Sequence, residues 1–129
     1  MKQLIAVYGT LKQGGSNQRV LEADNGTFVG KGTTVMKFTM FGGRGFPRVI
    51  YNGPETSKIH VEVFEMDGLD NMDMLEGHPN FFRRREIDVL FEDGTQKTAW
   101  MYFHPDIDPD QHADMIQADG YWEARHGLR

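Results

Sequence analysis

The pattern of apolar and polar residues predicts a protein built mainly from short β-strands. Between residues 58 and 66, Ile59, Val61 and Val63 alternate with polar side chains, which is typical of a strand with one buried face. Gln3–Tyr8 is a short apolar run followed at once by a turn-rich stretch, which is typical of a buried strand that enters a loop. Similar patterns predict further strands over residues 33–41, 46–51, 85–91 and 97–103.

After the strand at 58–66, the apolar residues change to helical spacing. Leu69, Met72 and Leu75 recur every third position, as on one face of a helix. Gly77 and Pro79 follow directly, and a glycine followed by a proline is typical of a helix C-terminus. The sequence therefore predicts a short helix over residues 69–75 that ends at Gly77.

Two more short helices are expected elsewhere in the chain. One covers residues 16–21, where a serine can cap the first turn, and the other covers residues 108–117 and begins with Asp-Pro. For the helix at 69–75, Asp67 or Asp70 is the expected N-terminal cap.

Turn signals between the strands favour hairpins and therefore a mostly antiparallel sheet. Residues 92–95 (Glu-Asp-Gly-Thr) are a strong hairpin signal, because Asp-Gly tolerates the positive φ that tight turns need. Pro47 places the strand at 46–51 at an edge of the sheet. We predict an α+β fold, a small mixed, mostly antiparallel β-barrel with short flanking helices, formed by residues 1–129 as a single domain.

Composition and charge exclude several classes of function. The chain has no cysteine, which excludes disulfide scaffolds, thiolate metal sites and cysteine nucleophiles. A formal net charge of -5 argues against general nucleic-acid binding, although residues 1–65 hold eight basic and five acidic side chains and would suit a small anionic ligand. No apolar stretch approaches the ~20 residues of a membrane span. We expect a cytoplasmic protein that binds neither membranes nor nucleic acids, and we favour a monomer.

The spacing of possible ligands argues against a metal site. Asp106, Asp108 and Asp110 resemble the start of a calcium loop, but Gln111 and Gln117 stand where that loop needs glycine and glutamate. The histidines are scattered, without a pair one helical turn apart. We therefore expect no bound metal.

The turn after the first strand is one of two segments that could carry chemistry. Gly9 follows Tyr8 and lets the backbone approach a ligand closely or turn sharply. Consecutive backbone N–H groups in such a turn, here within residues 7–14, can form a concave site for a carboxylate or an oxyanion. An ordinary strand–turn that contains a glycine would have the same pattern.

The second segment is the end of the helix predicted at residues 69–75. Glu76 follows the last apolar residue of the helical stripe, where the helix macrodipole disfavours a negative charge. A residue that breaks a local rule is a mild indication of function. The alternative is a glutamate that simply points into water.

Together, these two segments resemble the gamma-glutamylcyclotransferase-like family. The matching motifs are residues 8–11 (Tyr-Gly-Thr-Leu) and residues 75–79 (Leu-Glu-Gly-His-Pro). The longer string at 7–12 is closest to the gamma-glutamylamine cyclotransferase branch, and the resemblance covers roughly residues 4–103. Three further segments agree with the family pattern: 17–21, 45–47 and 62–66.

The resemblance implies a small barrel and an enzyme that acts on gamma-glutamyl compounds without a cofactor. Its products would be 5-oxoproline and a free amine. Glu76 falls on the catalytic glutamate of the family, and we expect it to act as general base and then as general acid in a partly desolvated pocket. Tyr8, Gly9, Thr10 and Leu11 fall on the substrate-binding loop, which must then lie beside Glu76.

One position departs from the family pattern, and other functions stay open. Two residues before Arg84 the family usually has a tyrosine, whereas this chain has Phe82. The sequence does not name the amine that leaves. Two alternatives to the enzyme are a non-catalytic small-molecule-binding module on the same scaffold and an interaction protein that uses the acidic second half of the chain.

Overall fold

The computed structural model describes residues 2–9, 25–42 and 47–121 of the chain. Its elements follow in the order β1 (Gln3–Val7), β2 (Thr27–Phe41), β3 (Arg48–Ile50), β4 (Ser57–Met66), α2 (Asp70–Glu76), β5 (Arg83–Phe91), β6 (Gln96–Phe103) and the short 3-10 helix η1 (Ala113–Met115).

The strands close into a barrel. Their order is β3-β2-β4-β1-β6-β5, and a further pairing of β2 with β5 joins the two sides of a five-stranded ring. The β1–β6 pair is parallel and the other pairs are antiparallel, which confirms the mixed, mostly antiparallel barrel. Strand β3 pairs with β2 outside the ring, as Pro47 predicted for an edge strand.

Strand β1 is apolar on both faces because it separates two hydrophobic clusters. Ala6 and Tyr8 face the barrel interior, where they pack with residues from every other strand of the ring. Ile5 and Val7 alternate with them and contact a second cluster, which includes residues of α2. A strand buried on both sides needs no polar alternation, which explains the run from Gln3 to Tyr8.

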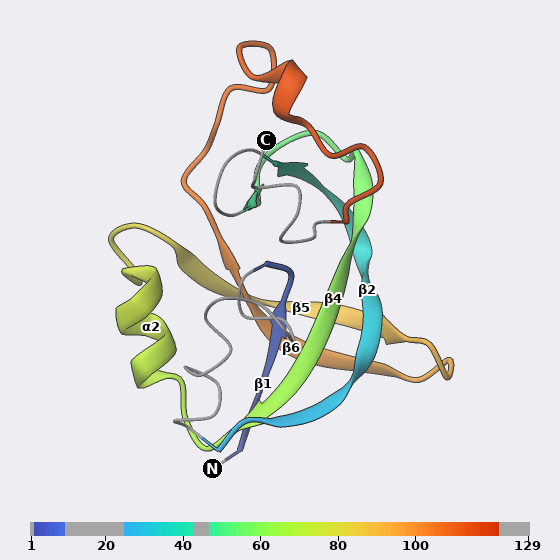
Figure 1. Ribbon diagram of the computed structural model, residues 1–129, viewed down its shortest axis with the longest axis vertical. Helices are drawn as coiled ribbons and strands as arrows, with labels where there is room; N and C mark the ends of the chain where they lie inside the picture. The colour runs from blue at the N-terminus through green and yellow to red at the C-terminus, as the bar shows by residue number, and fades with distance from the viewer. Residues whose placement is uncertain (1, 10–24, 43–46, 122–129) are drawn as a thin grey trace.

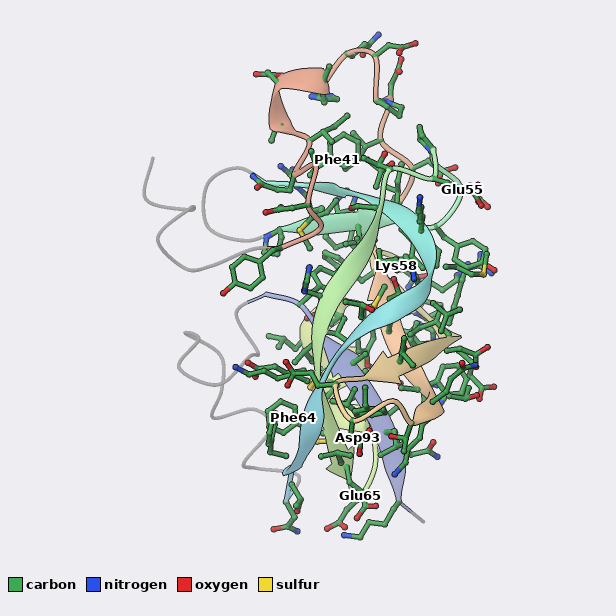
Figure 2. The ribbon with its side chains drawn as sticks, turned by 90° about the vertical axis from the view of Figure 1, so that its right-hand side faces the viewer. Phe41, Glu55, Lys58, Phe64, Glu65 and Asp93 are labelled. Carbon is green, nitrogen blue, oxygen red and sulfur yellow. The ribbon has the colours of Figure 1, made fainter. Side chains whose placement is uncertain are left out.

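The helix α2 lies outside the barrel, beside β1 (Figure 1). Its fully buried Met72 and the preceding Leu69 pack onto the outer faces of β1, β4 and β6. Figure 2 shows the long axis of the molecule vertically, with Phe41 and Glu55 toward one end and Glu65 and Asp93 toward the other. β1 runs toward the first of these ends, because it is antiparallel to β4, which starts there; its last residue, Val7, pairs with Glu62, about midway along β4.

Strand β2 begins six residues earlier than the sequence predicted, at Thr27 rather than Thr33. The added stretch contains Gly30 and Gly32, which weaken a strand signal. A Cβ atom at Gly32 would lie 2.3 Å from the carbonyl oxygen of Leu90. The glycine is therefore needed where β2 passes between β4 and β5, and the barrel could not close there with a larger residue.

The helix predicted over residues 108–117 is wrong. Only Ala113–Met115 form a single 3-10 turn, and Asp108 uses its carboxylate to accept the N–H of Asp110 instead of starting a helix. The segment also bonds to the end of β2: the Gly42 N–H donates to the carbonyl of Met115. The sequence has no apolar stripe here, so a helix would bury little apolar surface, and the segment forms backbone hydrogen bonds with strand ends instead.

The other local predictions have mixed outcomes. Gly77 ends α2 with a φ of 70°, as predicted, and the 92–95 turn has Gly94 at a φ of 90°. Neither aspartate caps α2: its N-cap position is Leu69, and Asp67 instead bonds to Lys2 and Asn25. The helix predicted at residues 16–21 lies outside the residues described. No helix in the described part of the chain is long and apolar enough to cross a membrane.

Candidate active site

Glu76 occupies the last helical position of α2 and is partly buried. Burial raises the pKa of its carboxyl group to about 7. Its place at a helix C-terminus also disfavours the charged form. The predicted partly desolvated environment of Glu76 is thus confirmed, and near neutral pH this group can both accept and release a proton.

Tyr8 directly follows β1, and its side chain is buried in the core inside the barrel. Its hydroxyl donates to the backbone carbonyl of Tyr102 on β6, at 2.7 Å between the oxygens. Burial raises the pKa of Tyr8 far above its ordinary value, and the negative charge of Glu76 raises it further. The fold therefore brings Tyr8 and Glu76, which are far apart in the sequence, within electrostatic range of each other.

Gly9 continues the chain from Tyr8 against Pro47. A Cβ atom at Gly9 would lie 2.8 Å from Cδ and 2.9 Å from Cγ of that proline ring, so a side chain at position 9 would displace one segment. Gly9 therefore allows the turn after β1 to pack directly on the residue that precedes β3. Thr10 and Leu11, the remaining residues predicted in this loop, lie outside the residues that the structure describes.

A polar cluster fastens the helix that carries Glu76 to the outer face of the barrel. Asp73 on α2 accepts from Nε of Arg84 at 2.8 Å and from the hydroxyl of Tyr102 at 2.6 Å. The Nη2 atom of Arg84 reaches the second Asp73 oxygen at 3.2 Å, which makes the pair bidentate. The guanidinium carbon of Arg84 lies 4.4 Å from the centre of the Trp100 ring.

Tyr102 connects Tyr8, at the end of β1, with the helix that carries Glu76. Its carbonyl holds the hydroxyl of Tyr8, and its own hydroxyl holds Asp73, which is one helical turn before Glu76. The same residue thus fixes the end of β1 and the helix α2. Side chains three positions apart on a helix are neighbours on its surface, so the position of Asp73 helps set that of Glu76.

Asp73 and Glu76, two of the three carboxyl side chains of α2, have opposite protonation behaviour. Burial alone would raise the pKa of Asp73, but its bonds to Arg84 and Tyr102 outweigh this effect and hold the pKa below its ordinary value. Asp73 therefore stays charged at neutral pH, whereas Glu76, with a pKa of about 7, exchanges its proton. Such a separation is typical of a site in which one group is structural and another moves protons.

Asp73 and Tyr102 are parts of this site that no pattern in the sequence indicates. Arg84, the middle residue of the Arg83–Arg85 run, forms a partly buried ion pair with Asp73. The signal for Arg84 was its match to the family pattern, but Asp73 and Tyr102 had none, because their contact depends on how α2 docks. Phe82, which stands at the family's tyrosine position, is buried among the apolar residues under α2.

The described residues contain no group of three or more histidine or acidic side chains that could hold a metal ion. The described part of the site consists of a partly buried carboxyl group with a pKa of about 7, a buried phenol and the backbone of Gly9 against Pro47. A carboxyl group with such a pKa can accept a proton from a bound molecule and return it near neutral pH.

Comparisons with known proteins identify the family. The family model described as "Gamma-glutamyl cyclotransferase, AIG2-like" matches residues 5–124. A Methanocaldococcus jannaschii protein named "Putative gamma-glutamylcyclotransferase" is 36% identical over 106 residues, which are 81% of this chain and 86% of that protein. A Rattus norvegicus protein named "Gamma-glutamylaminecyclotransferase" is 34% identical over 92 residues, which are 66% of this chain and 62% of that protein.

Solved structures show the same fold. The crystal structure of a mouse AIG2-like protein superposes with a TM-score of 0.80 at 24% identity, over 95% of this chain and 88% of that one. YkqA from Bacillus subtilis gives a TM-score of 0.69 at 23% identity, over 95% of this chain and 40% of that one. With the family model spanning most of the sequence, the chain belongs to the AIG2-like gamma-glutamyl cyclotransferase family.

Proposed function

We propose that this protein is a gamma-glutamylcyclotransferase that releases 5-oxoproline and a free amine from gamma-glutamyl amines or amides. Family membership and the names of the relatives support the general activity. The observation that carries the proposal is the placement of Glu76: a partly buried carboxyl with a pKa of about 7, in electrostatic range of the tyrosine that opens the Tyr8–Leu11 segment.

The proposed reaction is an intramolecular aminolysis. The α-amine of the gamma-glutamyl group attacks its own γ-carbonyl carbon, a five-membered lactam closes, and the bond to the departing amine breaks. An oriented intramolecular attack can contribute on the order of 7–11 kcal/mol through proximity. The main task of the protein is thus to hold the glutamyl arm folded back on itself.

Glu76 would move the protons that this reaction requires. The α-amine is an ammonium in water and must lose a proton before it can attack. The departing nitrogen must gain a proton before it can leave. A single carboxylate can accept the first proton and deliver it to the second nitrogen, and a pKa near neutrality suits both steps.

The Tyr8–Leu11 segment would bind the charged parts of the reacting group. Negative charge develops on the former carbonyl oxygen in the tetrahedral intermediate. We assign the backbone N–H groups of Gly9, Thr10 and Leu11 to that oxygen or to the α-carboxylate. One such donor is worth roughly 3–4 kcal/mol when it meets an oxyanion. Tyr8, held by Tyr102, would form the adjacent wall.

Purified protein incubated with gamma-glutamyl-ε-lysine and related gamma-glutamyl amides should release 5-oxoproline, which chromatography detects. Because Glu76 must start as a carboxylate, kcat/KM should rise with pH and level off above its pKa of about 7. Ligand-induced thermal stabilisation without any 5-oxoproline would instead support a non-catalytic binding module and would contradict the proposal.

Tyr102→Phe should lower kcat about three- to tenfold while leaving KM nearly unchanged. The substitution removes the hydroxyl that holds Asp73, so α2 is less firmly positioned, but the backbone carbonyl that bonds Tyr8 remains. Loss of one such hydrogen bond also costs about 1 kcal/mol of unfolding free energy. Steady-state kinetics and thermal unfolding provide both readouts. A loss of stability with kcat unaltered would show that the hydroxyl serves folding alone.

A further inference from the structure

A pocket of about 290 Å³ lies beside the site, between the α2–β5 connection and the end of β6. It begins at Pro79, three residues beyond Glu76, on one side, and at Phe103, one residue beyond Tyr102, on the other. The two walls are thus continuous with the elements that hold Glu76 and Tyr8. The volume is near the lower limit for small-molecule pockets, which suits part of a ligand better than a large one.

Aromatic rings form the walls of this pocket. On one side, the Tyr51 ring packs edge-on against Phe103 with their centres 5.2 Å apart. On the other side, Phe81 meets His104 with ring centres 5.0 Å apart. Phe81 stays half exposed although it is a large apolar residue, so its outer face is available to a ligand.

Two arginines at the start of β5 supply positive charge to the pocket. Side chains on a strand alternate between faces, so Arg83 and Arg85 lie on the same side as the core residue Ile87, at the point where the barrel opens. The guanidinium carbon of Arg85 lies 4.1 Å from the centre of the Tyr51 ring. In contrast to Arg84, neither arginine forms an ion pair with any acidic residue in the described ranges.

The remaining ionisable groups leave the pocket with a net positive charge. Asp106 is the acidic residue among the lining side chains. His104 adds no charge at neutral pH, because burial lowers its pKa from the ordinary value. Two guanidinium groups against one carboxylate favour an anionic ligand, and a guanidinium fork matches the geometry of a carboxylate.

We propose that this pocket is a subsite for the departing amine of the substrate, and that Arg83 and Arg85 bind a carboxylate that this amine carries. The inference rests on the proposed function and makes it more specific. The preferred substrates are gamma-glutamyl derivatives of amino acids or short peptides, whose apolar parts pack between Tyr51 and Phe81. Simple neutral alkylamides of glutamate are poorer substrates.

The test compares gamma-glutamylglycine with gamma-glutamylglycinamide, which differ in the charge of the departing group. Arg85→Gln should lower kcat/KM for the acid roughly 10- to 100-fold, as expected for loss of a charge-assisted hydrogen bond, and change that for the amide less than threefold. For each substrate, kcat/KM of the variant is divided by kcat/KM of the wild type. This ratio cancels the difference in intrinsic reactivity between the two leaving groups. Arg83→Gln should show the same selectivity, and Arg85→Lys should recover part of the loss.

The control variant is Lys97→Gln, which removes one positive charge from the far end of the β5–β6 hairpin. It should leave kcat/KM at the wild-type value for both the acid and the amide. Equal losses on both substrates would overturn the subsite, because they would assign the arginines to the glutamyl α-carboxylate or to folding. Equal turnover by wild type and variants would overturn it as well. In both cases 5-oxoproline is still formed, whereas its absence with every substrate would overturn the proposed function itself.

Discussion

Glu76→Gln should lower turnover of a gamma-glutamyl substrate by about 10²–10⁴-fold, the range that a general acid–base group contributes. Glutamine keeps the size and polarity of the side chain but can neither accept the ammonium proton nor return it to the departing nitrogen. Substrate binding should change little, because the proposed contacts to the glutamyl group come from the Tyr8–Leu11 segment. Single-turnover kinetics at saturating substrate would measure the chemical step directly.

The same variant should be more stable than wild type at alkaline pH. The folded state raises the pKa of Glu76 from 4.5 to about 7, so between these values the folded protein binds more protons than the unfolded chain. Wild-type stability therefore falls as the pH rises through this window, and above pH 7 the full cost of the buried charge is present. After allowance for solvent screening this cost is about 1–2 kcal/mol, which Glu76→Gln removes at pH 8 and not at pH 4.

Glu86→Gln is the matched control for both measurements. Glu86 is exposed on the outer face of β5, so its substitution should leave turnover unchanged and unfolding free energy within about 0.5 kcal/mol of wild type. A Glu76→Gln enzyme with full activity would assign the proton transfers to another group. A variant that is destabilised at pH 8 would show that the carboxylate of Glu76 has a partner that favours its charge.

The barrel could be predicted from local patterns because its strands alternate in the way that one buried face requires. The hairpin between β5 and β6 is the clearest case: Asp93 bonds to the N–H and the hydroxyl of Thr95, and Gly94 takes the positive φ that Asp-Gly predicts. The beginning of β2 could not be predicted in this way. Gly32 is in a strand because two neighbouring strands approach it closely, and that is a property of the closed barrel.

The candidate site could be predicted only in part, for a similar reason. Glu76 violates the charge preference of a helix end, and Gly9 follows a buried strand, so each left a local signal. The expectation that they share a site came from the family resemblance, and the structure adds that Tyr8 lies within electrostatic range of Glu76. Tyr102 left no signal, because its role depends on which face of β6 meets α2. Arg83 and Arg85 likewise have the sequence pattern of solvated residues, and only the structure shows that they line a pocket.

Met72→Ala should cost about 2–5 kcal/mol of unfolding free energy, as is usual when a large buried side chain is truncated. Met72 is fully buried between α2 and the barrel, and α2 has only seven residues. A helix this short has little stability of its own, so its docking decides whether it forms. Turnover should fall as well, since Glu76, the proposed proton carrier, lies on the same helix.

Met74→Ala provides the matched control for this prediction. Met74 lies two residues further along α2 and is 81% exposed, so the same chemical change at this position should shift the unfolding free energy by no more than about 0.5 kcal/mol. Urea unfolding of both variants, with equal m-values, would give the comparison. Equal destabilisation by the two substitutions would contradict the prediction, because it would mean that burial of Met72 does not hold α2 in place; alanine is the better helix former at both positions. A stable Met72→Ala protein with wild-type turnover would show that the polar contacts of Asp73 suffice to position Glu76.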